Sequence, residues 1–247
     1  MISPVIAFDN VSKSYPLYHH ITGGIKNFLF HLPQAIKALR TSQMQALRHI
    51  SFQVGQGETL GIIGRNGTGK STTLGLIAGV LKPSEGRIFV KGRVSPLLEL
   101  GAGFHPELTG RENIVLNGVL MGLSRREVAG KIDQIIDFSQ LAEHIDQPIR
   151  TFSTGMLARL GFSVVAHLEP EILLIDEILA VGDINFQKRC LERMTGFKRQ
   201  GVTMVFVSHI LGDIAKLCDR VLWLDNCVIK MAGPPQQVLQ AYTQEVG

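Results

Sequence analysis

The stretch Gly64-Arg65-Asn66-Gly67-Thr68-Gly69-Lys70-Ser71 fits the pattern G-x-x-x-x-G-K-[ST] at every fixed position. This pattern is typical of a phosphate-binding loop, because its glycines let successive backbone N–H groups point inward at the β- and γ-phosphates of a nucleotide. Lys70 adds a mobile positive charge, and the Ser71 hydroxyl is a ligand for Mg²⁺. The loop residues that we expect to contact a nucleoside triphosphate are Gly64, Asn66, Gly67, Gly69, Lys70, Ser71 and Thr72.

The flanking residues predict the strand–loop–helix order that this motif requires. Glu58–Ile63 reads as a short buried strand, and Thr72–Ala78 reads as a helix that ends at Gly79. The alternative is a glycine-rich turn without a ligand. A chance match seldom also has the right elements on both sides, so we favour the nucleotide site.

Length and composition restrict the class of protein. At 247 residues the chain accommodates one α/β nucleotide-binding domain with an inserted subdomain, and no second such domain. Hydrophobic residues make up 45%, yet the apolar runs stop short of the roughly 18–20 residues that a membrane-spanning helix needs. Residues Met1–Val5 lack the features of a signal peptide. Cys190, Cys218 and Cys227 lack metal-ligand spacing, so we expect buried thiols in a reducing cytoplasm.

The net charge of +4 is concentrated near the N-terminus. Between Asp9 and Glu58 there is no acidic residue, and five lysine or arginine residues lie there; the rest of the chain has 20 basic and 21 acidic residues. A local basic surface suits anionic lipid headgroups or a phosphorylated substrate, and on charge alone it also suits nucleic acid. A solvated surface without a partner is the remaining alternative.

The same N-terminal region contains an expected insertion. Val5–Phe8 and Ile50–Val54 read as strands, which leaves residues from about Val11 to His49 between them. Apolar residues recur at helical spacing over Ile25–Ile36, and Pro33 should break or kink that helix. The resulting amphipathic surface could lie at a membrane or pack on its own domain, and the pattern does not choose between these alternatives.

The centre of the chain reads as α-helical. Ser124-Arg125-Arg126-Glu127 is a capping box, and the apolar residues of Val128–Ile136 are spaced as one face of a helix. A second helix is expected over Thr154–His167. Before this block, Arg87–Val90 reads as a strand between two glycines.

The last third alternates strands and helices. Ile172–Ile175 and Val202–Val207 are unbroken apolar runs, as expected for parallel strands covered on both faces. Gln187–Arg199 reads as a helix between them that is stopped by Gly201. The pattern as a whole predicts an α/β fold with a largely parallel sheet.

Three polar residues follow these apolar runs. Asp176 and Glu177 end the run at 172–175, where an acid in the position of Asp176 helps to hold Mg²⁺ and Glu177 could polarise an attacking water. His209 follows the run at 202–207, from which an imidazole can reach the γ-phosphate side. On its own such a histidine is more often an ordinary surface residue. We assign catalytic roles to Glu177, His209 and Lys70.

Together these residues resemble the ATPase subunit of ABC transporters over nearly the whole chain. By this resemblance Tyr15 looks like the aromatic residue that stacks on adenine, and Phe152-Ser153-Thr154-Gly155-Met156 lies at the place of the signature loop. In this family the signature loop of one subunit closes over the ATP bound by the other. The resemblance therefore implies a homodimer that encloses two ATP molecules with Mg²⁺, Ser153 and Gly155 contacting the partner's nucleotide. Ala180-Val181-Gly182-Asp183 matches the D-loop at that interface.

The chain departs from the family pattern at two motifs. Thr154 replaces a glycine and Met156 a glutamine of the usual signature. The usual Q-loop glutamine is missing too, and its position falls near Glu99 or Leu100. Glu99 is our candidate for the sensing role, and with Ser71 and Asp176 it completes the residues expected on the metal side.

These departures resemble one branch of the family. Leu98–Asn113, the Ser-Thr-Gly-Met variant at 153–156 and Asp176–Asp183 look like ATPases that export lipid-linked polysaccharides, which include O-antigen, capsule and wall teichoic acid exporters. The N-terminal insertion looks most like the O-antigen members. Some of these relatives carry a C-terminal carbohydrate-binding domain, for which we expect no room after Tyr242–Gly247.

The resemblance implies a fold and a role. The expected fold is a P-loop NTPase (RecA-like) α/β core with an antiparallel β subdomain and an inserted α-helical subdomain. We expect a single domain over 1–247, with the core at about 1–100 and 168–247, the insertion at about 16–48 and the helical subdomain at about 105–167. The expected role is ATP hydrolysis that drives export of a lipid-linked polysaccharide.

The implied partners follow from that role. They are a second copy of the chain and an integral membrane permease dimer, which the chain would bind at the cytoplasmic face of the inner membrane. The alternative is a soluble ABC-type ATPase that acts on nucleic acid or ribosomes. Such proteins commonly join two cassettes or carry a long coiled-coil insertion, and neither fits in 247 residues. We therefore expect no nucleic acid partner.

Overall fold

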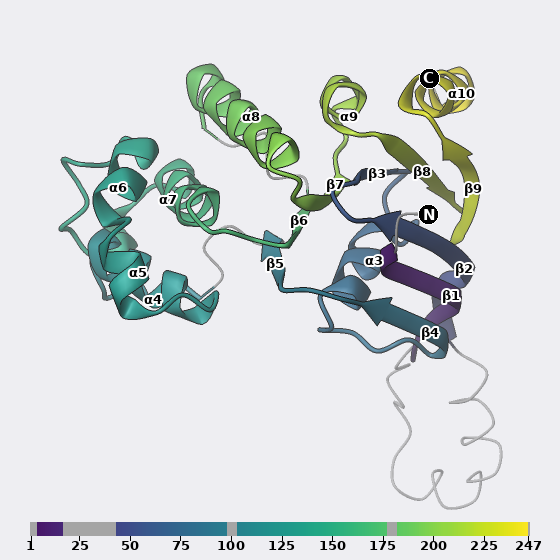
Figure 1. The fold of residues 1–247 in the computed structure, drawn as a ribbon, viewed down its shortest axis with the longest axis horizontal. Helices are drawn as coiled ribbons and strands as arrows, with labels where there is room; N and C mark the ends of the chain where they lie inside the picture. The colour runs from purple at the N-terminus through teal and green to yellow at the C-terminus, as the bar shows by residue number, and fades with distance from the viewer. Residues whose placement is uncertain (1–3, 17–42, 98–102, 177–181, 247) are drawn as a thin grey trace, which may run out of the picture.

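The computed structural model describes residues 4–16, 43–97, 103–176 and 182–246. Glu99, Glu177 and the amphipathic stretch expected at Ile25–Ile36 lie outside the described residues. In the described part, two sheets and a group of helices make up the fold (Figure 1). The predicted α/β class with its antiparallel and helical parts is confirmed.

The larger sheet has six strands in the order β5-β6-β7-β3-β8-β9. The first five run parallel, and β9 pairs antiparallel with β8. The strands are β3 (Thr59–Ile63), β5 (Val94–Leu97), β6 (Ile172–Asp176), β7 (Thr203–Val207), β8 (Arg220–Asp225) and β9 (Val228–Gly233). Since β3 and β7 are buried at every residue, the unbroken apolar runs of the sequence mark strands that are covered on both faces, as predicted.

Alternate residues of the central strands contribute to two separate cores, because side chains of a strand point to opposite faces. Leu174 and Val205 pack into the core shared with α3 (Lys70–Ile77) and the smaller sheet. Leu173 and Met204 pack on the other face with the helices that follow the strands. These helices are α8 (Ile184–Arg199), α9 (Leu211–Leu217) and α10 (Pro235–Val246).

The smaller sheet is antiparallel, in the order β2-β1-β4, with β1 at Pro4–Pro16, β2 at Gln43–Gly55 and β4 at Glu85–Val90. Strands β1 and β2 are longer than the predicted Val5–Phe8 and Ile50–Val54. Asn10 and His49 both have a φ of 50°, and the register shifts near them. These bulges break the alternation of apolar residues, which is why the sequence pattern concealed the outer halves of both strands.

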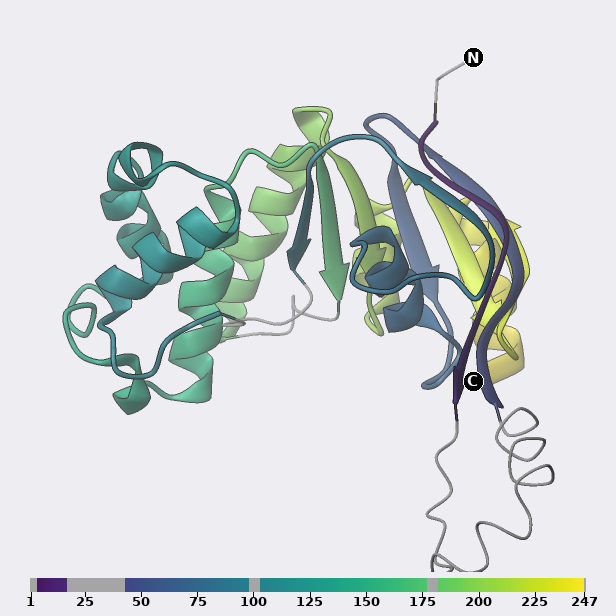
Figure 2. The ribbon, with the colours of Figure 1, turned by 90° about the horizontal axis from the view of Figure 1, so that it is seen from below.

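The helical part lies to one side of the sheets, beyond β5 and β6 (Figures 1 and 2). It contains α4 (Gly110–Leu120), α5 (Arg125–Ala129), α6 (Ile132–Ser139) and α7 (Thr154–Ala166), with a 3₁₀ turn at Ile149–Thr151. The capping box at Ser124 and Glu127 is present and starts α5, as predicted.

The single helical face predicted over Val128–Ile136 is wrong, because these residues belong to two helices. Helix α5 ends at Gly130, and α6 begins after Lys131. Glycine is costly inside a helix, and the Lys131 amine donates to the carbonyl of His167, 3.0 Å away. Val128, Ile135 and Ile136 nevertheless pack into one core, which is why their spacing resembles that of a single helical face.

The cysteines follow the prediction in part. Cys190 and Cys218 are buried, and burial raises the pKa of each thiol to about 12. Cys227 is only half-buried, because it lies in the turn between β8 and β9. Asn226 and Cys227 both have positive φ there, 47° and 65°, which is typical of a two-residue hairpin turn. All three are free thiols.

Candidate nucleotide site

The phosphate loop connects the end of β3 to the start of α3, as predicted. It approaches neighbouring backbone closely at two glycines. A Cβ on Gly64 would lie 2.3 Å from the carbonyl oxygen of Leu224, and one on Gly69 would lie 2.5 Å from that of Ala46. Both glycines also have positive φ, 150° and 100°. The loop is therefore held between β8 and β2 in a conformation that only glycine tolerates.

Lys70 lies under this loop and is 6% exposed. Its Nζ donates to the carbonyl oxygens of Gly64, 2.9 Å away, and Arg65, 3.1 Å away. Gly69 is the N-cap of α3 and has no side chain to accept from the first N–H groups of the helix. The loop and the helix N-terminus together therefore present positive charge where an anion can bind.

The side chains around the loop differ in exposure. Asn66, Gly67 and Ser71 are exposed, and Thr72 is half-buried. The exposed hydroxyl of Ser71, in the first turn of α3, is available to a metal ion bound beside the phosphates.

Asp176 and His209 lie at the same edge of the larger sheet as the loop. Strand β7 is flanked by β6 and β3, and its Val207 is paired with both Asp176 and Ile62. The loop begins two residues after Ile62, and His209 follows Val207 by two residues. Because the strands are parallel, all three groups project from their carboxyl ends. The structure thus brings together Lys70, Ser71, Asp176 and His209.

Tyr15 lies on the smaller sheet near the phosphate loop. It is paired across the strands with Met44, two residues from the Ala46 carbonyl that Gly69 approaches. The Tyr15 ring is half-buried, and the Lys13 amine lies over it, 5.0 Å from the ring centroid. This position, at the end of β1 and beside the loop, suits contact with the base of a nucleotide whose phosphates lie in the loop.

Two predicted site residues, Glu99 and Glu177, lie outside the described part, as do Ala180 and Val181 of the expected D-loop. Asp183, the last residue of that motif, is described. It caps α8 by accepting from the Phe186 N–H at 2.9 Å, and it pairs with Arg159 of α7. The Phe186 amide, more than Arg159, lowers the pKa of the Asp183 carboxyl.

Ser153 and Gly155 are exposed at the start of α7. The Ser153 hydroxyl accepts from the Met156 N–H at 3.2 Å and so caps the helix, which leaves its own proton available to another acceptor. Helices α7 and α3 lie on opposite sides of β5 and β6 in both views (Figures 1 and 2). One chain therefore does not bring Ser153 to its own phosphate loop.

Sequence reasoning missed the residues that support Ser153. Arg111 was noted only as part of the stretch Leu98–Asn113, but it forms an ion pair with Asp146, just before the signature loop. The available signal was Thr109-Gly110-Arg111-Glu112, a second capping box that marks the start of α4.

Comparison with known proteins identifies the family. The family model described as "ABC transporter" matches residues 47–180. The O-antigen export system ATP-binding protein RfbB of Klebsiella pneumoniae is 54% identical over 98% of this chain and 98% of its own length. The chain belongs to the ABC transporter family. The resemblance stated from the sequence is confirmed.

Two further proteins are similar. The teichoic acids export ATP-binding protein TagH of Listeria monocytogenes is 39% identical over 98% of this chain and 70% of its own length. The solved dimeric structure of the ATP-binding cassette MJ0796, bound to ADP and Pi, has a TM-score of 0.74 at 18% identity, covering 93% of this chain and 98% of that one. This likeness shows the fold of the ABC ATPase cassette.

Within the residues that the structure describes, we find no helix with the length and apolar character required to cross a bilayer.

Proposed function

We propose that this ABC ATPase powers export of a lipid-linked polysaccharide, most specifically O-antigen, through a separate permease in the cytoplasmic membrane. The observation that carries the proposal is the 54% identity, over 98% of both chains, to a protein named as the ATP-binding protein of an O-antigen export system. Sites for lipid or sugar are not needed on this chain, because the permease would carry the substrate. The chain supplies ATP hydrolysis, as ABC ATPases do.

Mg²⁺ fits the residues present. When bound, it would neutralise charge on the β- and γ-phosphates. It usually keeps several waters and takes one or two protein ligands, and the exposed Ser71 hydroxyl and the Asp176 carboxylate are donors of the right kind at the phosphate-loop edge. We assign Ser71 and Asp176 to the metal and keep Glu99 as a further candidate on that side.

The roles of the remaining residues follow from their positions. Tyr15 would stack on the adenine, Gly64–Thr72 would hold the phosphates, and Lys70 and His209 would stabilise charge in the transition state. Glu177 would orient the attacking water. Among the described residues, Tyr15 lies on the strand beside the loop, Lys70 begins α3 directly after the loop, and His209 follows β7; the role of Glu177 is taken from the sequence motif.

We further propose a head-to-tail dimer of this chain. Ser153 and Gly155 are exposed at the start of α7, and α7 lies on the other side of β5 and β6 from α3, the helix that follows the phosphate loop (Figures 1 and 2). In a second copy they would close over the bound ATP, where the Ser153 proton and the N-terminus of α7 favour the γ-phosphate. Loss of that phosphate after hydrolysis would open the dimer and move an attached permease.

The proposed division of labour follows the predicted domains. The core, at about 1–100 and 168–247, would bind ATP, and the helical subdomain, at about 105–167, would carry the signature loop and transmit motion. The basic segment between β1 and β2, within the predicted insertion at about 16–48, would lie near the membrane, where the chain would attach peripherally to the cytoplasmic face.

The test is deletion of the gene followed by analysis of surface glycans. We expect lipid-linked polymer to accumulate inside the cell and surface polymer to be lost, with rescue by the intact gene and not by a Lys70→Ala variant. Normal surface glycan in the deletion strain would contradict the proposal. Sedimentation with ribosomes, or ATPase stimulation by DNA or RNA, would instead favour the soluble alternative.

A further inference from the structure

The start of α4 is bound to the segment 144–152, which leads directly into Ser153. Backbone hydrogen bonds run in both directions between the two segments. Gly110 and Arg111 donate to the carbonyls of Gln147 and Ile145, at 3.2 and 3.0 Å, and Ile149 and Arg150 donate to those of Leu108 and Pro106, both at 3.0 Å. The signature loop is therefore preceded by a segment that is held at four points by residues 106–111.

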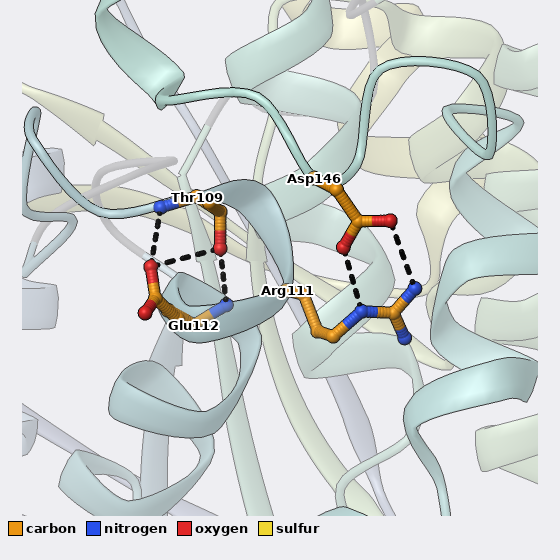
Figure 3. Close-up of polar contacts among 4 residues, drawn as sticks. All are labelled: Thr109, Arg111, Glu112 and Asp146. Atoms are coloured by element: carbon orange, nitrogen blue, oxygen red, sulfur yellow. Dashed lines mark hydrogen bonds and ion pairs between the residues drawn. The ribbon is translucent and has the colours of Figure 1, made fainter.

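Two ion pairs reinforce these bonds. Arg111 approaches both oxygens of Asp146, with Nε 2.8 Å and Nη2 3.4 Å from them (Figure 3). Arg150 pairs with Glu107 at 3.3 Å. The Arg111 guanidinium lowers the pKa of the Asp146 carboxyl by its hydrogen bond and its charge, so the first pair stays ionised at neutral pH.

The start of α4 is itself rigidly fixed. Thr109 and Glu112 exchange side-chain and backbone bonds in a capping box (Figure 3). One turn later, the fully buried Asn113 amide donates to the carbonyls of His105, Leu108 and Thr109 and accepts from the His105 N–H. A buried amide satisfied in this way specifies one backbone arrangement.

Gly110 packs against segment 144–152 with no space for a side chain. A Cβ there would lie 2.8 Å from Ile145 Cδ1, 3.0 Å from the Ile145 carbonyl oxygen and 3.2 Å from Phe152 Cζ. Phe152 is 8% exposed and immediately precedes Ser153. Since one of these neighbours is backbone, an added methyl group should shift the Ile145 carbonyl by a few tenths of an ångström as well as moving the Ile145 side chain.

From these contacts we infer that Gly110 and Arg111 are positioning residues for the signature loop: they hold segment 144–152 so that Ser153 can reach the ATP of a partner subunit. The inference rests on the proposed dimer, since one chain does not bring Ser153 to its own site. It adds to that proposal the named contacts by which the rest of the helical part sets the position of Ser153.

The ion pair between Arg111 and Asp146 is not explained by stability. The side chains of Arg111 and Asp146 are 41% and 71% exposed, and exposed pairs contribute little to folding. Loss of this pair should instead lower the rate of ATP hydrolysis by displacing segment 144–152, because small displacements of a group that contacts the reacting phosphate are costly.

The main experiment compares Gly110→Ala with Gly118→Ala in the full-length chain. Gly118 is on the same helix and more tightly packed, since its Cβ would lie 2.5 Å from Val128 Cγ2, but that neighbour is a side chain of α5 and does not belong to segment 144–152. Four quantities are measured: the nucleotide affinity of the monomer, the ATP concentration at which dimers form in a Glu177→Gln background, and kcat and KM in a background that keeps Glu177.

We expect Gly110→Ala to raise the ATP concentration needed for dimers, and to lower kcat/KM, by about tenfold. Its monomer should bind nucleotide within about twofold of the parent, because the phosphate loop is untouched. Gly118→Ala should leave both the dimer and kcat/KM unchanged. Equal dimer formation by Gly110→Ala and the parent, or an equal defect in both variants, would overturn the inference.

A charge exchange provides the second test, which also applies if Gly110→Ala fails to fold. Arg111→Asp and Asp146→Arg should each weaken ATP-driven dimer formation, and the double exchange should restore it at least in part. The same exchange at Lys131 and Glu169, paired at 2.9 Å elsewhere in the helical part, should change nothing in dimer formation. Failure of the double exchange to recover any dimer would count against the inference.

Ser153→Ala separates the inference from the proposal on which it depends. If that variant dimerises with ATP as the parent does, the proposed dimer contact itself is wrong. If Ser153→Ala impairs dimer formation and the Gly110 and Arg111 variants do not, only the positioning role is lost.

Discussion

The phosphate-loop edge and the signature loop both present groups to a phosphate, but they are built differently. At the edge, Lys70 begins α3, Asp176 ends β6 and His209 follows β7, so these groups come from one chain and need no second copy to lie at the same edge. At the start of α7, Ser153 is exposed on a helical part that lies beyond β6 (Figure 2). The described groups of the phosphate-loop edge therefore come from one chain, whereas Ser153 lies apart from that edge and has a role only in the proposed dimer.

The largest expected effect on turnover comes from Glu177→Gln. We expect ATP binding to persist and a closed dimer to accumulate, while turnover falls by about a hundredfold or more, because the group that orients water is lost. Steady-state ATPase assays and size-exclusion chromatography with ATP measure both effects. Glu171→Gln, at the other end of β6, is the control, and normal turnover in Glu177→Gln would refute the assigned role.

Lys70→Ala should affect only the phosphate-loop half. We expect nucleotide affinity to fall about ten- to a hundredfold, since a charge-assisted hydrogen bond to phosphate is removed. Calorimetric titration with ATP gives the affinity. Lys131→Ala is a matched control, because its Nζ also donates to a backbone carbonyl, that of His167 at 3.0 Å; unchanged affinity in Lys70→Ala would contradict the phosphate-loop assignment.

Ser153→Ala should affect the signature loop and leave the phosphate loop unchanged. Loss of the cap should destabilise the chain by about 1 kcal/mol, and ATP-driven dimer formation should be impaired while monomer affinity for ATP stays normal. Ser124→Ala removes an equivalent cap, also with a 3.2 Å bond, from α5. Denaturant unfolding should show similar losses for both variants, and a dimer defect shared by Ser124→Ala would remove the distinction between the two loops.

The smallest expected effect is a pH dependence of folding stability that arises from one histidine of the helical part. Burial lowers the pKa of His167, which packs against Phe138. The folded state then binds a proton less readily than the unfolded state, so stability should be full above about pH 6.5, the ordinary value, and should fall as pH drops toward the lowered value. The free energy of unfolding, measured in urea from pH 7.5 to 5, should fall less steeply with decreasing pH in His167→Gln than in the parent. The exposed His144→Gln is the control and should show the parental pH dependence.

Local patterns predicted the strands and the helix that surround the phosphate loop. The spacing of glycine, Lys70 and Ser71, and the apolar runs before Asp176 and His209, each depend on neighbours in sequence, and the sheet assembles them because parallel strands share a carboxyl edge. Prediction failed where contacts between residues far apart in sequence determine the local structure. The bulges at Asn10 and His49 hid half of β1 and β2, and Gly130 with Lys131 divided a helix that spacing alone made continuous.

The sequence by itself determined the nucleotide-binding loop with its flanking strand and helix, and it revealed the resemblance to ABC ATPases, because each of these motifs is specified by residues within a short stretch. Only the tertiary structure decided which residues support the signature loop. Gly110 touches Ile145 and Phe152, and Arg111 reaches Asp146, 35 residues away. Such contacts arise from how helices and loops pack in space, and no local periodicity encodes them.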